Sequence, residues 1–290
     1  DTRHQDFNLK SEIGNRQSAI NNWQLTVTSL LKDLRYALRT FVKRPGFTAV
    51  AVLTLALGIG ANSAIFSVVN SIVLRPLPYK DASSLMVFWG NLHNNGLNEI
   101  ELSAPELVDL QQQSRSFENI AGYTVQGFNL SGLDQPERLR GTLASANLFP
   151  TLGVNAALGR TFLSEEDQFE HDQVVLLSNP LWQRRFGSDP SIINRKITLD
   201  NQPVTVIGVM PAGFQFPEKD TELWRPLAFS PDLLTEDNRG SHFLNVIGRL
   251  APNVTQQQAQ AELDTVTARM TQDHKAIYRS GFSAAIRSLQ

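Results

Sequence analysis

The sequence of 290 residues contains no cysteine, and its formal net charge is only −2. Without cysteine, the chain cannot form a disulfide scaffold, an iron–sulfur site or a thiolate zinc site, and its redox compartment stays undecided. The small net charge gives no indication of nucleic-acid binding, because the basic residues are concentrated locally. We therefore expect no nucleic acid among the partners.

Motifs that carry known chemistry are also missing. The sequence has no Gly-x-x-x-x-Gly-Lys-Ser/Thr loop, no Gly-x-Ser-x-Gly and no His-Glu-x-x-His. Its five histidines are scattered, at His4, His93, His171, His242 and His274. We expect no catalytic, cofactor-binding or metal-binding residues, no enzymatic activity, and no ATP binding by this chain itself.

Two charged clusters have ordinary structural explanations. Glu165-Glu166-Asp167 follows Ser164, which is typical of the first turn of a helix; a metal site is the alternative. Four arginines could form a basic surface, although solvated or ion-paired side chains are the more common outcome: Arg138, Arg140, Arg184 and Arg185.

No charged residue occurs from Phe47 to Leu74. A helix rises about 1.5 Å per residue and a bilayer core is about 30 Å thick, so roughly 20 apolar residues are enough to cross it. A signal peptide would be shorter and would start nearer the N-terminus. A buried soluble helix is disfavoured because residues 47–57 have no polar face. The sequence predicts a transmembrane helix over residues 46–74.

A basic amphipathic helix is predicted over residues 29–45, directly before this span. Its apolar positions have helical spacing, which suits either the lipid surface or a protein partner. Basic residues occupy the other face and the junction with the span: Lys32, Arg35, Arg39, Lys43 and Arg44. This excess of positive charge predicts a cytoplasmic N-terminal tail over residues 1–28 and an extracytoplasmic location, periplasmic in a cell with an inner membrane, after about residue 75.

Small residues recur every four positions within the span, at Ala56, Gly60 and Ala64. Such a stripe allows a second helix to approach closely, and Asn62 beside it needs a hydrogen-bonding partner in hydrocarbon. We expect the partner helix to come from sequence outside this chain or from a second copy; glycines facing lipid are the alternative. Gly58 and Gly60 do not form a dinucleotide-binding loop, since the third glycine and the preceding strand are missing.

From Arg75 onward, the composition is that of a soluble domain. Ser103 to Glu106 and Thr255 to Gln258 predict helix starts with capping boxes. Strands are predicted at 85–89, 128–130, 138–146, 172–177, 196–199, 204–209, 224–229, 243–250 and 284–286, and helices at 103–113, 147–152, 180–186 and 255–273. The pattern predicts an α+β domain over residues 75–290, with strand–helix pairs at both ends and a hairpin-rich insert at about 153–238.

The chain begins at Asp1 and stops at Gln290, just after the start of a predicted strand. We interpret both ends as cuts in a longer protein. The sequence resembles MacB/FtsX-like ABC transporter permeases, and more narrowly the large permeases of acidobacteria. The resemblance covers about residues 30–290 and is carried by DLRYALRTFVKRPGFTAVAVLTLALGIGANSAIFSVVNSIVLRPLPY, PERLRGTLASANLFPTLGVNAALGRTFLSEED, ITLDNQPVTVIGVMPAGFQFP and RGSHFLNVIGRLAPNVTQQQAQAELD.

This resemblance implies one N-terminal transmembrane helix followed by a two-lobed periplasmic core domain, with a porter-like α/β lobe and an inserted lobe. Three more membrane helices should follow, and a separate ATPase subunit should bind the ATP. A periplasmic adaptor is a further possible partner. The family is thought to transmit ATP-driven motion to the outer domain for export or efflux, which would require a stiff connection through Leu74, Pro76 and Pro78.

A single-span, membrane-anchored extracytoplasmic binding or enzymatic domain is the competing interpretation. It predicts no ATPase partner and no further spans. The small-residue stripe favours the permease, because it requires neighbouring helices. The transported substrate cannot be read from the sequence.

Overall fold

The computed structural model describes residues 35, 39, 41–72, 79–92, 96–132, 135–279 and 281–289, and the side chains of all of these except 67–72. The chain divides into two compact units, Asp1–Arg75 and Pro76–Gln290. The predicted tail over 1–28 and the residues Leu74, Pro76 and Pro78 of the predicted stiff connection lie outside the described residues.

The first unit contains helix α2, Pro45–Ile72, which has 28 residues. Residues 41–43 are helical, Arg44 is not, and α2 then begins at Pro45. Proline explains this break, because it disfavours helical geometry at the residue before it and suits the first position of a new helix. The side chain of Thr48 accordingly donates back to the carbonyl oxygens of Phe41 and Arg44, at 2.8 and 3.0 Å.

The second unit is built on an 11-stranded mixed sheet with the order β11-β1-β10-β3-β4-β9-β6-β8-β5. Strand β1, Leu85–Leu92, lies between β11, Phe282–Ser288, and β10, Asn245–Leu250, and is antiparallel to both. The short strand β2, Leu97–Ile100, pairs with β1 as well. The two predicted strand–helix pairs, far apart in sequence, therefore form one structure.

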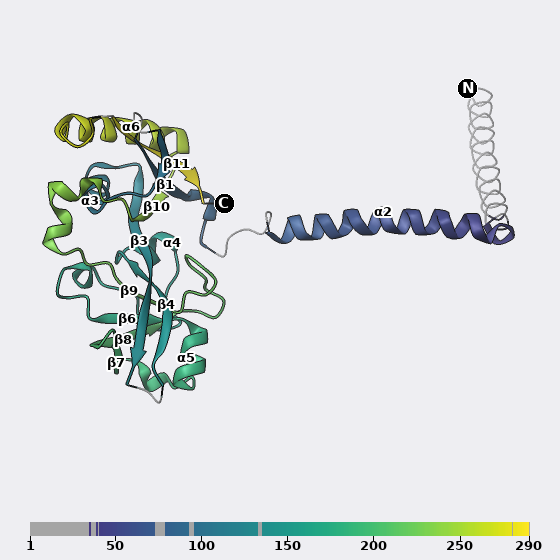
Figure 1. The fold of residues 1–290 in the computed structure, drawn as a ribbon, viewed down its shortest axis with the longest axis horizontal. Helices are drawn as coiled ribbons and strands as arrows, with labels where there is room; N and C mark the ends of the chain where they lie inside the picture. The colour runs from purple at the N-terminus through teal and green to yellow at the C-terminus, as the bar shows by residue number, and fades with distance from the viewer. Residues whose placement is uncertain are drawn as a thin grey trace, which may run out of the picture. The chain divides into compact units, whose positions relative to one another are not determined.

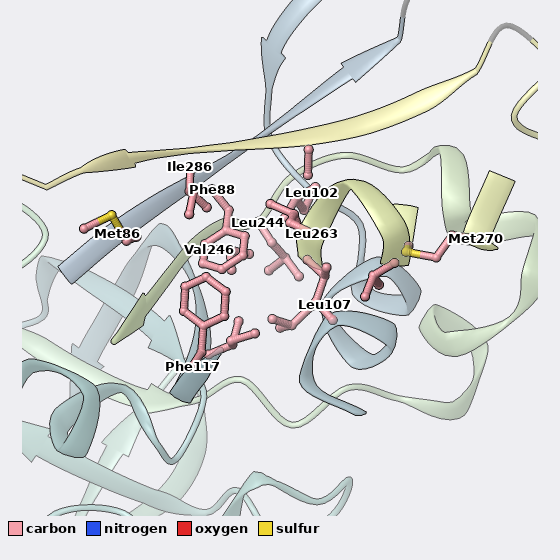
Figure 2. Packing of buried hydrophobic residues seen from close by; sticks show 14 of the residues in the cluster. Met86, Phe88, Leu102, Leu107, Phe117, Leu244, Val246, Leu263, Met270 and Ile286 are labelled. Carbon is pink, nitrogen blue, oxygen red and sulfur yellow. The ribbon is translucent and has the colours of Figure 1, made fainter. Parts of the chain in front are cut away.

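Two capped helices pack against this part of the sheet. Helix α3, Ala104–Gln113, and helix α6, Gln256–Asp273, both begin with the predicted capping boxes. Their apolar faces form one buried cluster with β1, β10 and β11 (Figure 2). We call these two helices with β1, β2, β10 and β11 the helical lobe.

The hairpin lobe is the other part of the domain. It contains the following elements, together with the distal halves of β3 and β4: β5 (Leu158–Gly159), β6 (Val174–Leu177), α5 (Asn179–Phe186), β7 (Lys196–Leu199), β8 (Gln202–Val209) and β9 (Leu223–Pro226). Phe128, Leu130 and Leu139 also belong to its core. Because these residues precede residue 153, the lobe includes more of the chain than the predicted insert.

Strand β3, Phe117–Ser131, connects the two lobes (Figure 1). Over its 15 residues it pairs first with β10 and then with β4, Glu137–Ala144. An aromatic cluster around the short helix α4, Leu148–Leu152, lies between the lobes, where Phe149 packs edge-on against Trp224 at 6.1 Å. A shared strand and a shared core make the lobes one continuous body rather than two tethered ones.

Short 3₁₀ turns occupy the connections. They are η1 (Ala82–Ser84), η3 (Ser164–Asp167), η4 (Pro190–Ile192), η5 (Pro231–Leu234) and η6 (Glu236–Gly240). The turns η1, η3, η5 and η6 contribute side chains or backbone groups to the sites described below.

Candidate functional site

Helix α2 presents an apolar surface on all sides. Its segment Pro45–Phe66 is long and apolar enough to cross a membrane, with a mean hydropathy of 1.9 and none of it buried. Ala56, Gly60, Asn62 and Ala64 are all exposed, and a Cβ placed on Gly60 would meet no atom within 4 Å. Within the described part of the chain nothing packs on the small-residue stripe, so its role in helix packing stays a prediction.

The basic residues before α2 are also exposed. Arg35, Arg39 and Lys43 are helical, and Arg44 lies at the break before α2; Lys32 falls outside the described residues. For these four exposed side chains the structure records no ion pair with any described residue. Their contact with lipid headgroups stays a prediction.

Arg249 fixes the first residues of the core domain. It lies on β10 and is 8% exposed. Among the described residues, all of its recorded hydrogen-bond partners are carbonyl or hydroxyl oxygens. Its Nε donates to Thr151 O of α4 at 2.8 Å. Its Nη1 donates to Asp81 O at 3.2 Å and to Ser84 Oγ at 2.6 Å, and its Nη2 donates to Lys80 O at 2.6 Å. One buried guanidinium thus holds residues 80–84 against the sheet and α4.

Tyr79 provides a second attachment next to the first. Its hydroxyl donates to Gln215 O at 3.1 Å, and its ring meets the ring of Phe216 edge-on at 6.2 Å. Burial raises the pKa of the Tyr79 hydroxyl to about 12, so it stays a donor at neutral pH. The start of the domain is therefore fastened to both the helical lobe and the region between the lobes.

The acidic cluster forms the predicted helical first turn, as turn η3. Glu166 accepts from Leu163 N at 2.8 Å and pairs with the Arg160 guanidinium at 2.6 Å. Burial alone would raise the pKa of Glu166, but the hydrogen bonds from Arg160 and Leu163 outweigh it, so the net pKa is lowered. Glu166 thus has a structural role, and the described part of the chain contains no group of three or more His, Asp or Glu side chains that could hold a metal ion.

Asp167, next to Glu166, differs in its surroundings. It accepts from Ala146 N at 2.9 Å and from Ala228 N at 3.1 Å, but it has no cationic partner among the described residues. Burial raises the pKa of this carboxyl group. It lies where two hollows meet beside α3, each with a volume of about 330 Å³.

The predicted basic surface is mostly ion-paired. Arg140 pairs with Glu218 and Asp220, at 3.1 and 2.7 Å. Arg184 pairs with Glu137 and Glu222, and Arg185 pairs with Glu137 at 3.2 Å. These contacts join β4 to α5 and both to the loop before β9. Arg138 is exposed and has no recorded ion pair with a described residue.

A polar network that the sequence did not indicate joins α3 to the segment after α6. Glu106, fully buried, accepts from Tyr278 Oη at 2.8 Å, and His242 Nε2 lies 3.4 Å from the same carboxylate oxygen. Arg239 of η6 pairs with Asp109 at 2.6 Å. Because its members are up to 172 positions apart, no local motif could have revealed the network. Arg249 did give a signal, as the only charged residue within the apolar run 243–250.

Comparison with known proteins identifies the family of the chain and the fold of its second unit. The sequence model of the MacB-like periplasmic core domain matches residues 48–266. A domain described as that of a permease from Porphyromonas gingivalis superposes with a TM-score of 0.55 at 16% identity, covering 73% of this chain and 93% of that one. The extracellular domain of the noncanonic ABC-type transporter YknZ from Gram-positive bacteria gives a TM-score of 0.50 at 13% identity, covering 70% and 99%. At these identities the structural likeness shows the fold alone. No curated relative matches the chain.

Proposed function

The chain belongs to the MacB-like periplasmic core domain family, and from this premise we propose that it is part of the permease subunit of an ATP-binding-cassette transporter. It would couple the motion of a cytoplasmic ATPase to its extracytoplasmic domain, for export or efflux. The predicted resemblance to this family is confirmed by the family match over residues 48–266. The family is one of transporter domains, in keeping with the lack of catalytic motifs.

The attachment of residues 79–84 to the domain is the observation that carries the proposal. Force from a membrane helix can move a domain only if the first residues of that domain do not yield. Arg249 donates to three groups of this segment, Lys80 O, Asp81 O and Ser84 Oγ. Buried hydrogen bonds to a charged group resist separation more than neutral, exposed ones.

The proposed orientation follows from charge. Arg35, Arg39, Lys43 and Arg44 precede α2, and cytoplasmic flanks of membrane helices are enriched in such residues. The tail before α2 would then be cytoplasmic and the core domain extracytoplasmic. An inner-membrane location with the domain in the periplasm agrees with the name of the family.

The proposed partners follow from what a permease requires. A separate ATPase subunit would supply ATP hydrolysis, since the chain has no P-loop. Helices from outside this chain, or from a second permease copy, would pack on Ala56, Gly60 and Ala64. A periplasmic adaptor is an additional candidate partner, and lipid would contact the apolar surface of α2.

The test uses the natural full-length protein, purified from its own membranes with an affinity tag. We expect an ATPase subunit with a Gly-x-x-x-x-Gly-Lys-Ser/Thr loop to copurify. A fluorophore on Ser241→Cys, the only cysteine this chain would then contain, should change its emission when ATP is added. If neither an ATPase nor a nucleotide response is found, the single-span anchored domain is the better interpretation.

A linker insertion then tests the coupling itself. A flexible Gly/Ser linker inserted directly before Tyr79 should leave ATPase copurification intact and abolish the fluorescence response to ATP, because it separates the membrane helix from both attachments, at Tyr79 and at the Arg249-bound segment. The same linker inserted after Ser188, in the exposed turn that follows α5, is the matched control and should leave the response intact. An unchanged response with the first linker would refute rigid coupling.

A further inference from the structure

A cleft beside helix α3 combines a polar half and an apolar half. The two halves are the adjoining hollows that share Gln111 and Asp167, each of about 330 Å³. Most of its lining residues come from α3, from β3, from the turns η3 and η5, and from residues 145–147 directly before α4. We call the two hollows together the α3 cleft.

The polar half has unused hydrogen-bonding capacity. Ser114 Oγ and Asn147 Oδ1 are buried there without a hydrogen-bond partner. Buried polar atoms are nearly always paired, because an unmade hydrogen bond costs about 1–3 kcal/mol. Both atoms belong to residues that line the same hollow, so this half of the cleft is polar and its hydrogen bonding is incomplete.

The charges around the cleft have one sign. Asp167 and Glu118 are in its walls, whereas the described residues that line it include no lysine, arginine or histidine. Glu118 also faces a neighbouring hollow that contains Lys80 and Arg249, so the negative charge specific to the α3 cleft is that of Asp167. Its carboxylate is anchored by the backbone N–H groups of Ala146 and Ala228 and still has lone pairs to offer.

The apolar half has the large exposed side chains of this region. Phe169 is 51% exposed and Leu234 is 44% exposed, and both line the hollow together with Val108 and Phe229. Among the described residues of the core domain only a few large apolar side chains are this exposed. An apolar group placed between them would remove their surface from water, at about 25 cal/mol per Å².

We propose that the α3 cleft binds an amphipathic organic cation, with its ammonium group against Asp167 and its apolar body against Phe169 and Leu234. An ammonium carries three donors and no acceptor, which matches walls that offer carboxylate, amide and hydroxyl oxygens. A carboxylate or phosphate ligand would meet Asp167 without a compensating cation. The site stands independently of transport, because it requires neither the ATPase nor α2.

The test measures binding to the full chain in detergent by isothermal titration calorimetry, with detergent alone as the blank. The probes are tryptamine, which has an indole and an ammonium, and indole-3-acetate, which has the same ring and the opposite charge. Tryptamine should bind about tenfold or more tightly than indole-3-acetate, since a charge-assisted hydrogen bond is present only for the amine. Equal affinity for both probes, or no tryptamine binding, overturns the proposal.

Three variants and one control variant locate the binding. Asp167→Asn should weaken tryptamine binding about tenfold, and Leu234→Ser should weaken it severalfold without touching the charge. Glu165→Gln removes a neighbouring acid that does not line the cleft and should leave binding unchanged. Asp167→Asn also alters the acceptors of two backbone N–H groups, so Leu234→Ser and Ser114→Ala provide the test if that variant fails to fold. Tryptamine affinity that is the same in all four variants contradicts the assignment.

Discussion

Tyr278 donates its hydroxyl hydrogen to Glu106 Oε1 across 2.8 Å, joining the segment after α6 to the first turn of α3. Glu106 uses its other oxygen to accept from Ser103 N at 2.8 Å, which completes the capping box. One fully buried carboxylate therefore both starts α3 and holds a distant part of the chain against it. Burial, together with the nearby charge of Glu106, raises the pKa of Tyr278, so the hydroxyl remains a donor.

We predict that Tyr278→Phe destabilises the core domain. The substitution removes the donor and leaves a buried carboxylate oxygen with only His242 nearby, at 3.4 Å, which should cost about 1–3 kcal/mol. Urea unfolding followed by tryptophan fluorescence measures the change. Tyr123→Phe is the matched control, because the Tyr123 hydroxyl has no recorded hydrogen bond to a described residue; an equal loss in both variants would show that Glu106 does not need Tyr278.

Replacing Arg249 should be more costly. Arg249→Met keeps the length of the side chain but leaves Thr151 O, Asp81 O and Lys80 O without their donor. The expected destabilisation in urea unfolding is about 3 kcal/mol or more, as for other broken buried charged networks. Arg249→Lys should recover only part of it, because an ammonium cannot reproduce the fork of donors.

Arg195→Met is the matched control for Arg249. Its ion pair with Asp189 spans 3.5 Å, and the Arg195 side chain is 60% exposed. Exposed pairs of this kind contribute about 0–1 kcal/mol. A loss for Arg249→Met no larger than that for Arg195→Met would remove the structural basis for a stiff attachment at residues 80–84.

The local elements of this fold could be predicted, and the distant contacts could not. Both capping boxes were recognised because their partners are three residues apart. Strand β3 was expected only at 128–130 but begins at Phe117, since Gly122 and Gly127 interrupt the apolar pattern. Packing favours glycine at position 122, because a Cβ there would lie 2.5 Å from Leu107 Cδ2 and the Leu107 side chain would have to shift.

The α3 cleft and the Arg249 attachment depend on tertiary structure in the same way. Asp167 was interpreted as a residue of a helical turn, which is correct for its backbone. Its carboxylate accepts hydrogen bonds from Ala146 N, directly before α4, and from Ala228 N, after β9. These hydrogen bonds depend on how α4 and β9 pack. No spacing along the sequence predicts these contacts, so a site of this kind can be recognised only from the structure.

The stability of η3 should depend on pH in a defined direction. The net pKa of Glu166 is lowered from its ordinary value of 4.5, so the folded state favours the ionised form. The resulting stability is present above pH 4.5 and is lost as the pH falls through the lower, folded pKa. Urea unfolding of Glu166→Gln should therefore vary less with pH below about 4.5 than that of the natural protein. Glu165→Gln should keep the natural pH dependence; if both variants keep it, Arg160 does not hold Glu166 ionised.

The absence of cysteine makes the proposed orientation directly testable. Single cysteines at Ser241→Cys, in the core domain, and at Arg39→Cys, before α2, replace exposed residues. A membrane-impermeant maleimide should label Ser241→Cys in cells whose extracytoplasmic side is accessible, and Arg39→Cys only after the membrane is permeabilised. The natural chain is the unlabelled control. Labelling of Arg39→Cys in sealed cells would reverse the orientation that the positive charges predict.

Helix α6 protects the outer edge of strand β11. Gln260 Nε2 donates to Ala284 O and Gln260 Oε1 accepts from Ile286 N, both at 2.9 Å, so one side-chain amide takes the place of a neighbouring strand. Thr271 similarly accepts from Phe282 N, at 3.3 Å. Unpaired strand edges recruit other chains, and native proteins commonly cover them.

We predict that Gln260→Leu exposes this edge. The substitution leaves Ala284 O and Ile286 N without partners, which should cost about 1–3 kcal/mol in urea unfolding and promote strand-to-strand association. Light scattering after size-exclusion chromatography of the full chain in detergent measures the association. Gln257→Leu adds the same apolar side chain at an exposed position of α6 and should change neither quantity. Association that is equally strong in both variants would assign it to surface hydrophobicity, whereas association specific to Gln260→Leu would show that the amide of Gln260 keeps β11 from pairing with another chain.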